Sequence, residues 1–90
     1  MSHGFGMSIK ELKADELRHA AADKGYDSQY RDGTVNIADV TGLTVAVRIV
    51  DGKYCMKGKR HDIYFAEANS VMKRIPKAFE IMKTNLNKNY

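Results

Sequence analysis

The sequence predicts an α+β fold: a helix, an antiparallel meander of four strands with a fifth left open, and a second helix. Three glycine-centred turn signals predict the strands: Asp32-Gly33, Thr41-Gly42 and Asp51-Gly52 each separate short segments rich in β-branched residues. A helical pattern lies on either side of this region. Only one face of the predicted strands is strongly apolar, so we expect both helices to pack on that face.

The first helix is predicted over residues 9–24, because its start, its apolar stripe and its end all carry a signal. Ser8 and Glu11 have the spacing of a capping box, in which each side chain binds the other residue's backbone amide. Gly25 supplies the left-handed residue that commonly ends a helix. The residues expected to face the core share one broad helical arc: Ile9, Leu12, Leu17, Ala20 and Ala21.

Strands are predicted over residues 26–30, 34–39, 43–50 and 53–57, and the turns between them set their pairing. Asp51-Gly52 suits a two-residue type I′ hairpin. A two-residue turn at Thr41-Gly42 would bring polar residues onto the apolar face, whereas a three-residue loop with a left-handed Gly42 keeps that face apolar. We therefore choose the three-residue loop. The expected pairs are Tyr30 with Val35, Val35 with Val47, Ile37 with Val45, Val47 with Met56, and Ile49 with Tyr54.

This register predicts the composition of both sheet faces. The inner face should hold Tyr30, Val35, Ile37, Val45, Val47, Ile49, Tyr54 and Met56. The outer face should hold Thr34, Asn36, Ala46, Arg48, Val50, Lys53, Cys55 and Lys57. Residues 61–65 allow two interpretations: a fifth strand with Ile63 inward beside Tyr54, which we favour, or a first helical turn capped by Asp62.

Apolar residues at alternating spacings of three and four predict a long second helix: Phe65, Ala68, Met72, Ile75, Phe79, Met82 and Leu86. Pro76 lies inside this stripe and is expected to kink or break the helix near Ile75. The chain is therefore divided into a flexible leader (1–7), one α+β domain (8–86) and a frayed tail (87–90).

Composition narrows the class of protein. Hydrophobic residues make up 43% of the 90 residues, which suits a single small globular domain. Cys55 is the only cysteine, so an internal disulfide is excluded and a reducing, cytoplasmic location is expected. No apolar run in the sequence approaches the roughly 18 residues that a membrane span needs, and no membrane partner is expected.

Charge is distributed unevenly along the chain. Residues 1–52 hold six Lys/Arg and eight Asp/Glu, a net charge of −2, whereas residues 53–90 hold nine and three, a net charge of +6. The sum is the +4 of the whole chain. This segregation indicates either an anionic partner for the C-terminal half or an ordinary solvated helix face.

Motifs for catalysis are absent from the sequence. It contains no glycine-rich phosphate loop, nucleophile elbow or zinc-ligand spacing, so we expect a non-catalytic protein without metal or cofactor. His19, His61 and Cys55 would form a metal site only if the fold joined distant elements. His61 and Asp62 would point to opposite faces of a strand. Nearby cations could make the Cys55 thiol reactive, but a half-buried filler is the favoured interpretation.

Basic residues are the remaining candidates for a site. A binding surface is predicted on the outer sheet face and the loop that follows it: Arg48, Lys53, Lys57, Lys59 and Arg60. A second, separate basic region is predicted opposite the apolar stripe of the second helix: Lys73, Arg74 and Lys77. No aromatic residue is expected on the outer face, so contact with a duplex backbone is favoured over base stacking.

The order of elements, with both helices on one sheet face and a basic loop before the second helix, resembles that of double-stranded-RNA-binding domains. The resemblance concerns topology alone. Asp62 to Phe65 stand where small residues and lysines would be looked for at the start of the second helix, so no family membership follows.

Three functional hypotheses follow. The first is a non-catalytic module that docks an anionic surface, most simply a nucleic-acid backbone. The second is a small regulator or inhibitor, of the kind that phages and mobile elements encode, which binds a host protein or nucleoprotein complex through exposed apolar residues such as Val50 and Ile81. The third is self-association as a homodimer through the edge strand at residues 26–30.

Overall fold

A computed structural model describes residues 8–88 of the chain, with side chains through Asn85. The predicted leader, residues 1–7, and the last two residues of the predicted tail lie outside the described residues. The elements are α1 (Ile9–Asp23), β1 (Asp27–Arg31), β2 (Thr34–Ala38), β3 (Thr44–Val50), β4 (Lys53–Lys57), β5 (Asp62–Phe65) and α2 (Ala68–Lys88).

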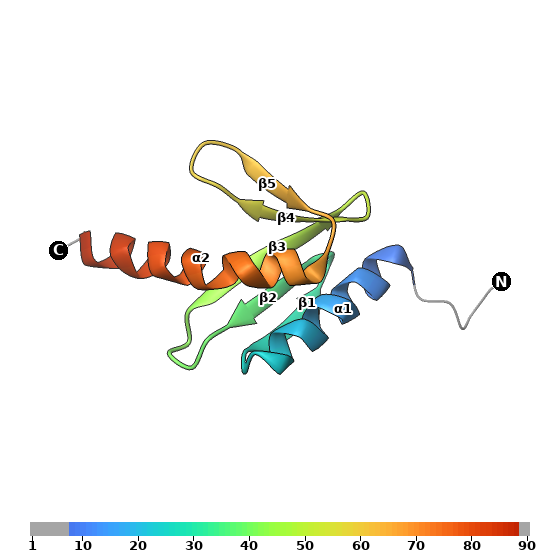
Figure 1. Cartoon of the computed structure of the whole chain (residues 1–90), viewed down its shortest axis with the longest axis horizontal. Coiled ribbons are helices and arrows are strands. Elements are labelled where there is room, and N and C mark those ends of the chain that lie inside the picture. The colour runs from blue at the N-terminus through green and yellow to red at the C-terminus, as the bar shows by residue number, and fades with distance from the viewer. Residues whose placement is uncertain (1–7, 89–90) are drawn as a thin grey trace.

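The five strands form one antiparallel sheet in sequential order, β1-β2-β3-β4-β5. The two helices pack on one face of this sheet, α1 against β1–β3 and α2 against β3 and β5, and they also contact each other (Figure 1). The predicted fold class is therefore confirmed, including the fifth strand. The outer sheet face carries no helix within the described part of the chain.

The α1 helix begins and ends as predicted, but it faces the sheet differently. Ser8 and Glu11 form both hydrogen bonds of the capping box, each 3.2 Å long, and Gly25 has a φ of 86°. The buried residues are Ala14, Leu17 and Ala21, whereas Ile9 and Leu12 are 66% and 49% exposed. The predicted arc spans about half of the helix circumference. Only the part of this arc with Leu17 and Ala21 packs against the sheet, whereas the part with Ile9 and Leu12 is exposed.

The hairpin registers confirm the choice of turns. Tyr30 pairs with Val35, Val35 with Val47, Ile37 with Val45, and Ile49 with Tyr54. The loop after β2 is closed by Asp39, whose carboxylate accepts hydrogen bonds from the amides of Thr41 and Leu43, and Gly42 has a φ of 92°. The Thr41 hydroxyl also donates a hydrogen bond to this carboxylate. This bond is the main cause that lowers the pKa of Asp39, and the two amide bonds add to it.

Two details of the register differ from the prediction. The ladder between β3 and β4 ends at Arg48 and Cys55, so Val47 and Met56 are not ladder partners. In β5, Ile63 pairs with Met56, and Phe65 rather than Ile63 lies opposite Tyr54. From Arg48 toward the start of β3 at Thr44, the β4–β5 hairpin diverges from β3, and the sheet opens there (Figure 1).

The α2 helix runs without interruption from Ala68 to Lys88, through Pro76 and two residues beyond the predicted end at Leu86. A break at Ile75 is thereby excluded. Pro76 itself is exposed, on the side of the helix away from the core. The buried stripe contains Met72, Ile75 and Phe79 as predicted, together with Val71. Phe65, placed at the head of this stripe, belongs to β5.

The core lies between the inner sheet face and the two helices. All the predicted inner-face residues are buried except Tyr30, which is half-buried against the core. Tyr54 is fully buried at the centre, and its hydroxyl donates a 2.6 Å hydrogen bond to the backbone carbonyl of Lys13 in α1. This bond attaches the first helix to the middle of β4.

Candidate functional site

The three cations predicted on the outer sheet face are exposed and lie on that face. Arg48, Lys53 and Lys57 alternate along β3 and β4 with inward residues such as Ile49 and Tyr54. The alternation arises because successive side chains of a strand point to opposite faces. The sequence-based placement of these cations therefore agrees with the strand geometry.

Arg48 is held by an ion pair that the sequence analysis did not include. Its guanidinium lies 3.0 Å from the Asp62 carboxylate of β5, and its Nη2 also lies 3.4 Å from the Cys55 sulfur. Both partners of the ion pair are partly exposed, so the pair contributes little to stability but restricts the arginine's orientation. Asp62 also reduces the net positive charge of the outer face.

Cys55 lies on the outer side of β4, but its exposed fraction is only 2%. Arg48 of β3 and Tyr64 of β5 are its cross-strand neighbours on the same face. Their side chains cover the thiol, which therefore fills a gap in the sheet surface. This burial argues against the reactive thiol considered from the sequence.

Tyr64 is a surface aromatic residue that the sequence analysis missed. It pairs with Cys55 in the β4–β5 ladder and is 53% exposed on the outer face, so the expectation of an outer face without aromatic residues is wrong. Its hydrogen-bonding interaction with the Cys55 thiol is the main cause that raises the pKa of its hydroxyl. The alternation of Ile63, Tyr64 and Phe65 would have revealed it, once residues 61–65 were taken as a strand.

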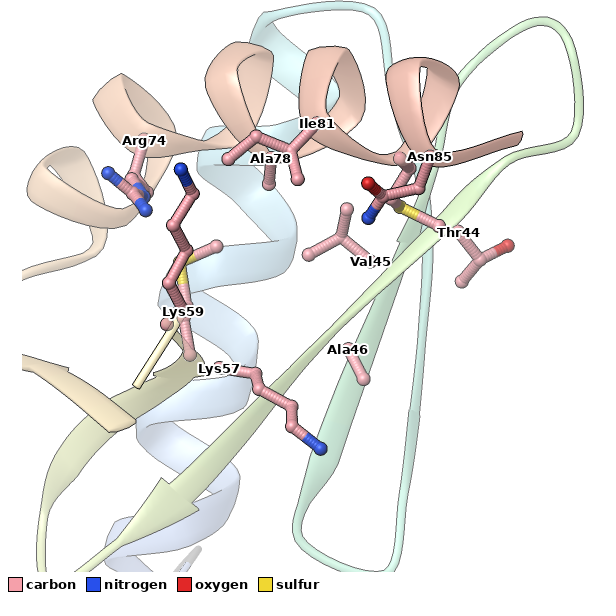
Figure 2. A pocket seen from close by; sticks show the side chains of 12 residues that line it. Thr44, Val45, Ala46, Lys57, Lys59, Arg74, Ala78, Ile81 and Asn85 are labelled. Carbon is pink, nitrogen blue, oxygen red and sulfur yellow. The ribbon is translucent and has the colours of Figure 1, made fainter. Parts of the chain in front are cut away.

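A groove of about 620 Å³ opens where β3 and β4 diverge beneath the C-terminal half of α2 (Figure 2). The parts of β3 and β4 that are not paired with each other form one side of this groove, and α2 forms the other. Its lining is mainly apolar, with cations at one end: Thr44, Val45, Ala46, Met56, Lys57, Gly58, Lys59, Arg74, Ala78, Ile81, Met82 and Asn85. Ile81, assigned to the polar side of the helix, thus lines this groove.

Lys59 joins the two basic regions that the sequence analysis kept apart. In Figure 2 the end of its side chain lies toward Arg74 of α2, while Lys57 extends in the opposite direction. Lys59 also lines a smaller hollow with Lys77. Lys59 therefore lies between the two predicted basic regions, because the β4–β5 loop folds back toward the helix. Arg60 follows on the same loop and is exposed, and Lys73 lines neither hollow.

Most of these cations have no carboxylate partner within the described part of the chain. Only Arg48 with Asp62 and His19 with Asp15 come within 4.0 Å there. Glu80 lines the smaller hollow beside Lys59 and Lys77 without forming an ion pair. Lys53, Lys57, Lys59, Arg60, Arg74 and Lys77 are thus available to an anionic partner.

The fold does not bring the candidate metal ligands together. His19 lies on α1, 3.7 Å from Asp15, and belongs to the hollow between the helices, whereas Cys55 is buried in the sheet. Between residues 8 and 88, no three His, Cys, Asp or Glu side chains gather closely enough to hold a metal ion. What the described surface offers is charge, an apolar groove and an exposed aromatic ring.

Comparison with protein-family models, with curated proteins and with solved structures gives no match to this chain. Neither α1 nor α2 has the length and apolar character that crossing a membrane requires.

Proposed function

We propose that this protein is a small non-catalytic binding module that docks an anionic surface, most simply the backbone of a nucleic acid. The observation that carries the proposal is the continuity of unpaired cations around Lys59. Lys53 and Lys57 of β4 lead to Lys59 and Arg60 of the loop, and Lys59 lines one hollow with Arg74 and another with Lys77 of α2. Arg48 adds an oriented guanidinium on the sheet face.

This arrangement favours a polyanion, because such a partner gains from many weak contacts at once. Each exposed lysine or arginine that neutralises a phosphate releases condensed counterions, and this release drives association. Eight of the eleven Asp and Glu residues of the chain lie in residues 1–52. A negatively charged strand on the basic surface therefore meets little repulsion.

Direct titration tests the proposal. Labelled duplex and single-stranded oligonucleotides are titrated with the protein at about 50 mM and about 200 mM salt, where binding is expected to weaken strongly as salt rises. The double variant Lys59→Glu/Arg74→Glu should bind far more weakly. The variant Lys10→Glu/Lys24→Glu, which changes the net charge equally on α1, should bind almost normally. Absence of binding at the lower salt concentration contradicts the proposal.

The apolar groove favours a second candidate function, a small regulator or inhibitor that binds a host protein or nucleoprotein complex. Met56, Ile81 and Met82 line the groove, and methionine is common at surfaces that adapt to a partner. Ile81 is half-buried and accessible from the groove. This candidate is tested by affinity purification from host cells with the wild type and with Ile81→Lys. A stoichiometric protein recovered only by the wild type supports the regulator, and recovery of nucleic acid alone opposes it.

A further inference from the structure

We propose that the outer face of the sheet binds single-stranded nucleic acid, with Tyr64 stacking on a base while arginines and lysines contact the backbone. This inference rests on the proposed function and names the form of nucleic acid that the surface takes. It starts from the exposed aromatic ring on β5, which the sequence analysis had not placed there.

One row of residues crosses the whole outer face. The ladders place Arg31 opposite Thr34, Thr34 opposite Arg48, Arg48 opposite Cys55 and Cys55 opposite Tyr64. Directly paired residues share a face of the sheet, so the row runs from β1 to β5. Neighbouring strands lie about 4.8 Å apart. Arg31 is therefore about 10 Å from Arg48 along the row, and Arg48 is about 10 Å from Tyr64.

The members of this row alternate between long and short side chains. Arg31, Arg48 and Tyr64 are exposed, whereas Thr34 is half-buried and Cys55 is buried. Arg48 and Tyr64 cover Cys55, so the guanidinium and the aromatic ring lie close together at one end of the row. A flexible strand crossing the sheet thus meets a cation, a second cation and an aromatic ring in succession.

Tyr64 can offer the free side of its ring to a base. It lies next to Cys55 and exposes 53% of its surface, so one part of the residue rests on the sheet while another part faces solvent. Every base has an aromatic face, and stacking on a tyrosine is therefore tolerant of sequence. In a duplex the bases are already stacked on one another, so Tyr64 would have no such partner.

The charges beside the row complement a phosphate backbone. Lys53 and Lys57 lie two residues before and after Cys55 on the same face of β4. Asp62, which lies on this face opposite Lys57, is paired with Arg48, so it orients the guanidinium and loses part of its own repulsion. Asp27 lies at the far end of β1, four residues from Arg31, and Gln29 lies between them on this face.

The surface beside the β1–β2 part of the row is mainly polar, with one charged residue, Asp27, at its far end. Gln29 and Asn36 form a ladder pair on this face and line a shallow hollow with Thr44 and Ala38. Amide side chains can donate to and accept from base edges that are not engaged in base pairing. A single strand, whose base edges are free, can use them.

The test compares binding of single strands and duplexes by fluorescence anisotropy. Labelled oligo-dT and oligo-rU of about 15 nucleotides and a duplex of the same length serve as probes. We expect tighter binding of at least one single strand than of the duplex. Tyr64→Ala should weaken single-strand binding about tenfold, Tyr64→Phe should restore it, and duplex binding should change little.

A second variant and a measurement of mass complete the design. Arg31→Gln, at the opposite end of the row, should weaken single-strand binding several-fold, whereas the matched charge control Lys24→Gln on α1 should not; circular dichroism confirms that each variant folds. Sedimentation shows whether a second copy of the chain occupies this face instead. A dimer that Tyr64→Ala dissociates overturns the inference.

The outcomes separate this inference from the proposed function. Equal affinity for single strands and duplex, or normal single-strand binding by both Tyr64→Ala and Arg31→Gln, overturns the inference but leaves backbone docking in place. Failure to bind any oligonucleotide at about 50 mM salt overturns both.

Discussion

Tyr54 connects three separate parts of the fold through one side chain. Its hydroxyl donates to the Lys13 carbonyl, and the Lys13 ammonium group lies 5.3 Å from the centre of its ring. The same ammonium donates a 2.9 Å hydrogen bond to the carbonyl of Ala66, just before α2. Strand β4, helix α1 and the entry to α2 therefore meet at this tyrosine.

Tyr54→Phe is expected to lower the free energy of unfolding by about 1 kcal/mol, because one buried hydrogen bond is lost while the ring remains. The variant should also change how stability depends on pH. Burial, with a smaller effect of Glu16, raises the pKa of Tyr54 to about 12 from its ordinary value of 10. The folded protein thus keeps this proton more tightly than the unfolded chain.

The sign of the pH effect follows from that difference. The contribution is fully present below pH 10 and is lost as pH rises from about 10 toward about 12, where the unfolded chain ionises first. Urea unfolding at pH 8 and pH 11 measures it. The wild type should lose more stability between these two pH values than Tyr54→Phe does, and an equal loss in both would contradict the assignment.

At the scale of elements, the β4–β5 loop depends on the absence of a side chain at Gly58. A Cβ at this position would collide with the carbonyl oxygen of His61, to which the Gly58 amide donates a 3.1 Å hydrogen bond. Ile63 closes the space on the other side. The turn that carries Lys59 and Arg60 is therefore tightly constrained.

Gly58→Ala is expected to lower stability by about 1–3 kcal/mol, as overpacking does, and to weaken oligonucleotide binding because Lys59 is displaced from Arg74. Gly25→Ala provides a matched control. An alanine at Gly25 would be strained by the backbone φ of 86°, but no other atom lies within 4 Å of the added Cβ. The position also lies outside the basic surface. Binding that falls equally in the two variants would show that stability, not loop position, is responsible.

The α2 helix contains an unfavourable residue in its interior. Pro76 cannot donate to the carbonyl of Met72, and it is exposed, so it adds no core packing. Pro76→Ala is expected to raise the free energy of unfolding, by at most about 3 kcal/mol, without changing the core. The urea midpoint measures this gain. An unchanged or lower midpoint would mean that the helix geometry already compensates for the proline.

Elements with strong local signals were predictable from the sequence, and contacts between elements were less so. Glycine-centred turns fixed the register of four strands, because a one-residue slip would have reversed every side chain. The rotation of α1 depends on the shape of the sheet, so Ile9 and Leu12 were assigned inward although they are exposed. The meeting of Lys59 with Arg74 depends on how the β4–β5 loop folds back, for which no local pattern exists.

The whole molecule has an acidic region and a basic region. Between α1 and α2 lies a hollow of about 690 Å³ whose lining includes Glu16, Asp23 and Glu67. The cations around Lys59 lie instead on the β4–β5 loop and on the second and third turns of α2, at Arg74 and Lys77. Such a separation of charge orients a polyanion before contact, since it is attracted to one region and repelled by the other.

The dependence of affinity on salt measures how many phosphates this basic region contacts. About four contacts predict a slope of log K against log salt of roughly −3.6 for a duplex and roughly −2.8 for a single strand. Removing the charge of Lys59 by Lys59→Gln should make either slope shallower by about one contact, whereas Lys24→Gln on α1 should leave it unchanged. A slope near zero would mean that phosphate contacts do not drive binding. Equal changes in the two variants would mean that net charge, and not the arrangement around Lys59, governs binding.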